Sequence, residues 1–111
     1  MTLCASDRPW LYLATDGKLF KIGISIAPDE RVQYLTSPRE FRGKLRRAEL
    51  VKVWYMRGYA HIVERAVKEH FIGRRIGDWC TEWFGKTTEA EIVKFVKRFA
   101  VAHLRMHPQS T

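Results

Sequence analysis

The stretch "WLYLATDGKLFKIGIS", residues 10–25, decides how this chain folds. Two short apolar runs are joined by Thr-Asp-Gly-Lys, and Asp-Gly between such runs is typical of a two-residue β-hairpin turn of type I′. A turn at Asp16-Gly17 would pair Tyr12 directly with Lys21. The sequence therefore opens with a predicted antiparallel pair of strands.

The two faces of this hairpin differ in chemistry because successive strand residues point to opposite sides. One face is apolar and is predicted to meet the core: Leu11, Leu13, Phe20, Ile22 and Ile24. The other face sets Tyr12 beside Lys21, with Gly23 as an open patch that allows close approach. The cation would favour the phenolate and make Tyr12 a better base, whereas the alternative is a simple packing or cation–π pair.

The remaining segments predict an α+β domain with a small, mainly antiparallel three-stranded sheet flanked by helices, in the order β-β-α-β-α-(β)-α. Pro28 opens a helix that carries Arg31 in its first turn. The elements expected after it are a loop over 36–44, a strand over 48–56, a helix over 60–71, a short strand around Trp83 and a helix opening at the Thr88 capping box. We expect one domain over 10–106, an N-terminal extension over 1–9 and a frayed tail over 107–111.

Charge gives the first indication of function. The 111 residues contain 20 Lys and Arg against 12 Asp and Glu, which favours a polyanionic partner, nucleic acid above all. Basic residues gather near Phe41, Trp54 and Tyr55, a mixture suited to phosphate contacts and base stacking. The expected nucleic-acid-binding residues are Arg39, Arg42, Lys44, Arg46, Arg47, Lys52, Arg74 and Arg75.

Cysteine count and hydropathy indicate the cellular compartment of the protein. Cys4 and Cys80 match no zinc-ligand spacing, and no apolar run is long enough for a membrane span. The N-terminus lacks the pattern of a secretory signal. We expect a cytoplasmic protein of bacterial, phage or plasmid origin, without a membrane partner, as a monomer or homodimer.

Four motifs resemble a known family. Trp10-Leu11-Tyr12, then Lys21-Ile22-Gly23, then Arg31 eight residues beyond the glycine, is similar to the GIY-YIG nuclease superfamily. KIG in place of YIG resembles its phage-associated branch, described as a DNA-binding domain. "HIVERAVKEHF" (61–71) looks like the family's helix with the metal-binding glutamate, and "RRIGDWCTEWF" (74–84) looks like that branch's closing segment.

The resemblance implies a metal-dependent endonuclease that hydrolyses DNA phosphodiester bonds. Glu64 would hold one Mg²⁺ or Mn²⁺, Tyr12 helped by Lys21 would activate the attacking water, and Arg31 would stabilise phosphate charge. These four side chains are then expected to converge on one cleft. Glu82 and His61 are further candidates for the site. His61 is expected to face solvent, and His70 to lie near the core-facing side of its helix.

Departures from the family pattern keep a second function open. Trp10 replaces the glycine of the first motif, Lys21 replaces a tyrosine, and the chain contains no Asn to match the family's late asparagine. The alternative is a catalytically inactive nucleic-acid-binding module of the same fold. A third reading is an accessory protein that binds another protein through its acidic surface.

Overall fold

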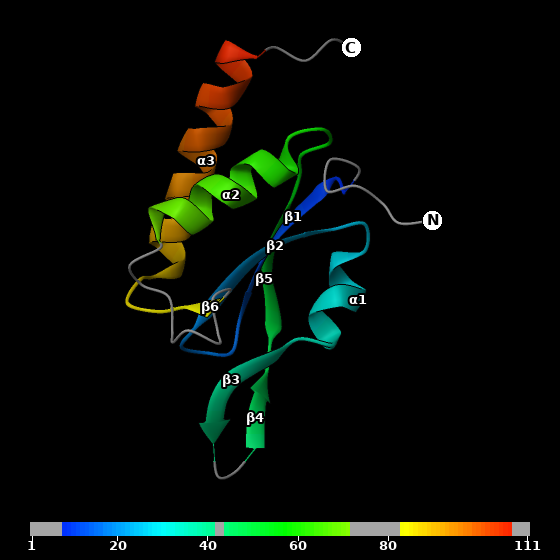
Figure 1. The fold of residues 1–111 in the computed structure, drawn as a ribbon, viewed down its shortest axis with the longest axis vertical. Helices are drawn as coiled ribbons and strands as arrows, with labels where there is room; N and C mark the ends of the chain where they lie inside the picture. The colour runs from blue at the N-terminus through cyan, green and yellow to red at the C-terminus, as the bar shows by residue number, and fades with distance from the viewer. Residues whose placement is uncertain (1–7, 42–43, 72–82, 108–111) are drawn as a thin grey trace.

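The computed structural model describes residues 8–41, 44–71 and 83–107, and its fold is α+β, as predicted (Figure 1). The strands are β1 (Trp10–Thr15), β2 (Phe20–Ser25), β3 (Thr36–Phe41), β4 (Lys44–Arg47), β5 (Glu49–Tyr55) and β6 (Trp83–Phe84). The helices are α1 (Pro28–Gln33), α2 (Ala60–His70) and α3 (Glu89–Met106). The expected short strand around Trp83 is confirmed as β6.

The central sheet has four antiparallel strands in the order β5-β1-β2-β6. Its hairpin differs from the sequence-based expectation by two residues of register, because Tyr12 lies opposite Gly23 and not opposite Lys21. An even shift leaves every side chain on its predicted face. Lys21 pairs with Ala14 instead, so that Tyr12 and Lys21 are diagonal neighbours on one face.

The turn explains the shift. The predicted type I′ turn is wrong, since the connection between β1 and β2 is a four-residue loop built on the Asp16 side chain. Asp16 Oδ1 accepts hydrogen bonds from the backbone N–H groups of Lys18 (2.9 Å) and Leu19 (2.7 Å). Gly17 takes φ +105°, a value that favours glycine. The aspartate thus organises the loop through its side chain instead of occupying a left-handed turn position.

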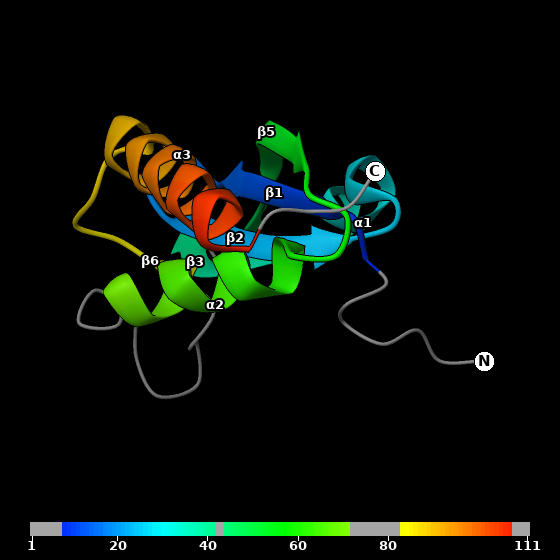
Figure 2. The ribbon, with the colours of Figure 1, turned by 90° about the horizontal axis from the view of Figure 1, so that it is seen from above.

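One face of the sheet packs against α2 and α3. Figure 2 shows these two helices next to each other, with α1 set apart from them. The predicted apolar face of the hairpin is confirmed here. The fully or nearly fully buried members of this first core are Leu11, Leu13, Ile22, Ile24, Met56, Tyr59, Ala60, Val63, Val67, Phe71, Phe84, Ile92, Val96 and Ala100.

The other face of the sheet holds a second, smaller core beneath α1. Its buried members are Tyr12, Ala14, Val32, Leu35, Ala48 and Trp83, with Leu19, Leu50 and Val53 packed around them. Pro28 stands at the start of α1 as predicted. The two cores share β1 and β2, whose alternate residues point into one or the other.

A separate hairpin, β3–β4, forms where a loop was predicted over 36–44. Its strands pair with each other as a two-stranded sheet, with Phe41 opposite Lys44 and Thr36 opposite Arg47. Figure 1 shows this ribbon extending from the lower end of the molecule, away from α2 and α3. Of the hairpin side chains that are described, only Ser37 is buried, and none belongs to either core.

Candidate functional site

Tyr12 is buried on the α1 face, with 2% of its surface exposed. Its ring lies against Gly23, and a Cβ atom added at Gly23 would come within 2.7 Å of the Tyr12 Cε2 atom. Real Cβ atoms essentially never approach so closely. Gly23 is thus required by the tyrosine ring itself, and the open patch that the sequence suggested at Gly23 is filled by that ring.

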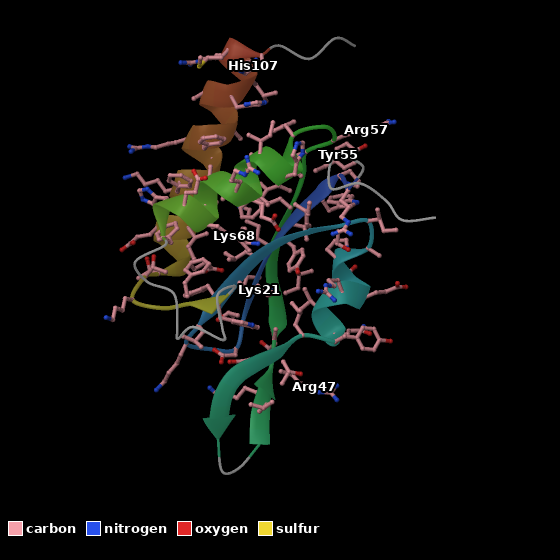
Figure 3. All side chains as sticks on the ribbon, in the orientation of Figure 1. Lys21, Arg47, Tyr55, Arg57, Lys68 and His107 are labelled. Carbon is pink, nitrogen blue, oxygen red and sulfur yellow. The ribbon has the colours of Figure 1, made fainter. Side chains whose placement is uncertain are left out.

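Lys21 is also buried, with 4% of its surface exposed. Figure 3 marks its place on β2, beside β6. Lys21 pairs with Trp83 of β6 on one side and with Ala14 of β1 on the other. A buried ammonium is costly unless it is compensated, and Lys21 does have a polar or electrostatic interaction. Tyr12 and Lys21 therefore share one covered face of the sheet.

Arg31 is exposed on α1 and belongs to the last turn of that helix, not to its first turn as the sequence suggested. The helix has six residues, and the Arg31 backbone N–H already donates to the Ala27 carbonyl at 3.0 Å. This N–H group is therefore not available to the expected clamp of helix amides plus guanidinium. The Arg31 side chain can reach an anion in solution on the α1 side of the sheet.

Glu64 lies on α2, which covers the opposite face of the sheet from Tyr12. Val63 and Val67, its neighbours on the helix, are fully buried in the core beneath α2 and α3. The Glu64 carboxylate lies 3.7 Å from Lys68 Nζ, and both side chains are partly exposed. Such a pair one helical turn apart stabilises a helix by roughly 0.2–0.5 kcal/mol. Tyr12 and Lys21 thus belong to one face, and the helix of Glu64 to the other.

Of the two histidines of α2, His61 differs from the expectation, whereas His70 packs on core aromatic rings as expected. His61 was expected to face solvent, but it is half-buried, and its Nδ1 atom is buried with no hydrogen-bond partner in the part of the chain that is described. His70 is exposed at the end of α2, where its ring stacks on Phe95 with centroids 4.3 Å apart. Glu82 falls outside the described residues, as do Arg74 and Arg75.

The basic residues divide between the β3–β4 hairpin and β5. Residues 36–47 carry five Lys and Arg against one Glu, a net charge of +4, which is half of the +8 of the whole chain. Arg47 is exposed on β4 and lies toward the lower end of the molecule in Figure 3. Arg46 is half-buried, and its guanidinium lies beside Gly17 of the β1–β2 loop. Arg42 and the side chains of Arg39 and Lys44 lie outside the described part. The hairpin thus concentrates positive charge on a projecting ribbon.

Lys52 belongs to a different surface. It is exposed on β5, and its Nζ lies 5.6 Å from the centroid of the Trp54 ring, within the range of a cation–π contact. Its partner on β1 is Leu13, which faces the α2/α3 core. Lys52 therefore lies on the opposite side of the sheet from Tyr12, so the basic residues of β5 and those of the α1 side are separated.

Sequence reasoning missed a cavity on the α1 face. The space measures about 430 Å³ and is lined by Trp10, Ile26, Ala27, Pro28, Asp29, Glu30 and Val53. No motif marks this cavity in the sequence, although Trp10 stands where the family motif has glycine. The volume of the cavity falls within the usual range of small-ligand pockets, roughly 300–1,000 Å³.

The described residues contain neither a metal-binding cluster nor a membrane-spanning helix. Among residues 8–41, 44–71 and 83–107, no group of three or more His, Cys, Asp and Glu side chains is placed to hold a metal ion. None of the helices in those ranges is both long and apolar enough to cross a membrane.

The fold and the motifs define a class: a small basic α+β domain with an antiparallel sheet and a tyrosine, a lysine and a glycine on one face of its first hairpin. The chain belongs to the T5orf172 domain family, whose model matches residues 10–100. This phage-associated domain is often grouped with GIY-YIG-like nucleases. No curated protein and no solved structure matches the chain.

Proposed function

We propose that this domain binds nucleic acid, DNA in particular, through the β3–β4 hairpin. The observation that carries the proposal is the projecting ribbon with half of the chain's net charge, including the exposed Arg47. A two-stranded ribbon can enter the major groove of DNA or follow a phosphate backbone. Arginines on such a ribbon offer bidentate contacts to phosphate oxygens.

Neighbouring residues extend this surface. α1 leads directly into β3, and it carries the exposed Arg31. Tyr34, just beyond α1, is 80% exposed, an unusual position for a ring of that size in a globular domain. An exposed aromatic ring between Arg31 and the basic hairpin suits stacking on a base while the phosphates are neutralised nearby.

The test is salt-dependent binding of labelled single-stranded and double-stranded DNA, followed by fluorescence anisotropy between about 50 and 200 mM salt. We expect Arg46→Gln with Arg47→Gln to weaken binding for all sequences. Each phosphate interaction that these substitutions remove should lower the slope of log K against log salt by about 1.

The matched control is Arg98→Gln with Arg105→Gln, which removes the same charge from exposed positions on α3. This variant should lose little affinity and keep the salt slope. Equal losses in both variants would mean that net charge, and not the hairpin, determines binding. Absence of binding by the unmodified protein would overturn the proposal.

A second candidate is metal-dependent cleavage of DNA, and membership of the family together with the retained motif residues favours it. Tyr12 and Lys21 share one face of the sheet, and α1 with Arg31 covers that face. Against cleavage stand the burial of Tyr12 and the placement of α2 on the other face. Binding is therefore the function that the geometry supports better.

Glu64 would hold the metal in that second candidate. A single carboxylate with several waters suits Mg²⁺, and the Glu64 side chain is partly exposed, although the cation would compete with Lys68. Bound Mg²⁺ would supply Lewis-acid stabilisation of the leaving oxygen. Arg31 lies on the α1 side of the sheet, so it would contact a different phosphate from the one beside Glu64.

Cleavage is tested by incubating supercoiled plasmid with Mg²⁺ or Mn²⁺, with and without EDTA, for the unmodified chain, Glu64→Gln and Glu69→Gln. Glu69 is exposed on the same helix and serves as the matched control. Metal-dependent nicking that is abolished in Glu64→Gln and kept in Glu69→Gln would establish the enzyme. DNA binding without nicking would exclude the nuclease and support the nucleic-acid-binding module.

A further inference from the structure

The cavity on the α1 face combines apolar walls with two carboxylates. Trp10 and Val53 contribute from β1 and β5, and both point to the same face of the sheet as Tyr12. The segment between β2 and α1 forms the opposite wall, with Ile26 as its exposed apolar member. A cavity of about 430 Å³ with such walls favours a flat, largely apolar ligand over a bare ion.

The carboxylates of Asp29 and Glu30 set the polarity of any ligand. Both are exposed, and neither has an ion pair or hydrogen bond with another part of the described chain. Acidic residues in the first turn stabilise a helix through its dipole. The dipole accounts for the acids but not for the cavity beside them. The two negative charges disfavour a phosphate there and favour a ligand that donates hydrogen bonds.

Trp10 contributes an aromatic ring to the wall of the cavity. The indole is half-buried and meets Tyr55 in an edge-to-face contact, with centroids 5.1 Å apart and planes at 72°. That contact holds the indole at a fixed angle in the cavity wall. Nucleic-acid bases stack on such rings with little dependence on sequence.

We propose that this cavity receives an unstacked guanine base from a single strand of nucleic acid, an inference that rests on the proposed nucleic-acid binding. Trp10 stacks on the base, and the carboxylate of Asp29 or Glu30 accepts hydrogen bonds from its N1–H and N2–H₂ groups. These two adjacent donors match the two oxygens of one carboxylate. Thymine offers one N–H between two carbonyl oxygens, which the carboxylate repels.

The segment that connects the cavity to the start of the hairpin is short. The cavity lies at the start of α1, and β3 begins just after the end of α1. A helix of six residues spans about 9 Å. The exposed side chains of Arg31 and Tyr34 lie between the two places along the chain. A strand whose phosphates contact the hairpin and Arg31 can therefore place a base in the cavity while its backbone avoids Asp29 and Glu30.

The test compares three labelled oligothymidines that carry guanine, hypoxanthine or thymine at the central position, by anisotropy at one salt concentration. Hypoxanthine keeps N1–H but lacks the N2 amino group. We expect the guanine strand to bind roughly tenfold more tightly than the thymine strand, as for one bidentate base contact. The hypoxanthine strand should fall between them.

Two variants assign the preference to the cavity. Asp29→Asn with Glu30→Gln should abolish the guanine preference while leaving the affinity for the thymine strand equal or higher. Trp10→Ala should weaken binding of the guanine strand and of the hypoxanthine strand, whose central bases enter the cavity. Glu49→Gln is the matched control, because Glu49 is an exposed carboxylate at the start of β5 and does not line the cavity.

The outcomes separate this inference from the proposed function. DNA binding that depends on Arg46 and Arg47 but shows no preference among the three strands would overturn the guanine site and leave the hairpin proposal intact. A guanine preference that survives Asp29→Asn with Glu30→Gln would also overturn it. Failure to bind any strand would overturn both. Circular dichroism of each variant confirms that the fold is retained.

Discussion

At residue scale, Tyr12 and Gly23 pack in direct contact. A Cβ atom at position 23 would overlap the Tyr12 ring, and both residues lie inside the sheet, where the backbone can shift little. We therefore expect Gly23→Ala to lower the free energy of unfolding by about 1–3 kcal/mol, the usual cost of overpacking a core. Urea unfolding followed by circular dichroism measures it.

A double-mutant cycle shows whether the clash is the cause. In a Tyr12→Leu background, the ring is absent, and Gly23→Ala should then cost distinctly less than in the unmodified chain. An equal cost in both backgrounds would place the strain elsewhere in the strand. A smaller cost of Gly23→Ala in the Tyr12→Leu background would show that the glycine is required for the packing of the phenol ring. It would then not be needed as an open patch for a ligand.

The hairpin also shows what a sequence can predict at this scale. The alternation of strand side chains between two faces assigned the core residues of β1 and β2 to their correct faces. It could not assign the partners, because a shift by two residues leaves the faces unchanged. The partners depend on the loop, and the Asp16 side chain forms a wider loop than Asp-Gly suggested.

At the scale of elements, α3 begins at a cap that the sequence predicted. Thr88 Oγ1 accepts a hydrogen bond from the Glu91 backbone N–H at 3.2 Å. Thr88→Ala should therefore lower the free energy of unfolding by about 1 kcal/mol. Thr87→Ala is the control, because Thr87 donates an exposed hydrogen bond to the Glu91 carboxylate and does not cap the backbone. A larger loss of stability from Thr87→Ala than from Thr88→Ala would contradict this assignment.

The β3–β4 hairpin was the element that sequence reasoning missed. Pro38 and Gly43 are typical of loops, and the segment lacks the alternation of apolar and polar residues that marks a half-buried strand. A two-stranded ribbon outside the core needs no such alternation, because its backbone hydrogen bonds do not depend on which face is apolar. The charge of the segment was visible in the sequence, but its projection from the domain was not.

At the scale of the whole molecule, the candidate site depends on the arrangement of elements around the sheet. The motif residues can be found in the sequence because each has a fixed spacing from its neighbours. Their distribution over two faces could not be predicted, because Glu64 lies on a helix whose position is set by the buried Val63 and Val67. Motifs therefore predicted membership of the family better than the geometry of its site.

The two cores share β1 and β2, so the domain should unfold as one cooperative unit. Leu35→Ala removes an aliphatic side chain from the α1 core, and Ile92→Ala removes one from the α2/α3 core. Each should lower the free energy of unfolding by about 2–5 kcal/mol. The exposed Val101→Ala should cost less than about 0.5 kcal/mol.

Far-ultraviolet circular dichroism reports mainly on the longer helices α2 and α3, whereas tryptophan fluorescence includes Trp83 of the α1 core. Either core variant should shift a single unfolding transition by the same amount in both measurements. Coincident transitions are the mark of two-state unfolding. If Leu35→Ala instead shifts the fluorescence transition and leaves the circular dichroism transition in place, the faces of the sheet unfold separately. In that event the α1 side could order or loosen upon binding DNA without disturbing the rest of the domain.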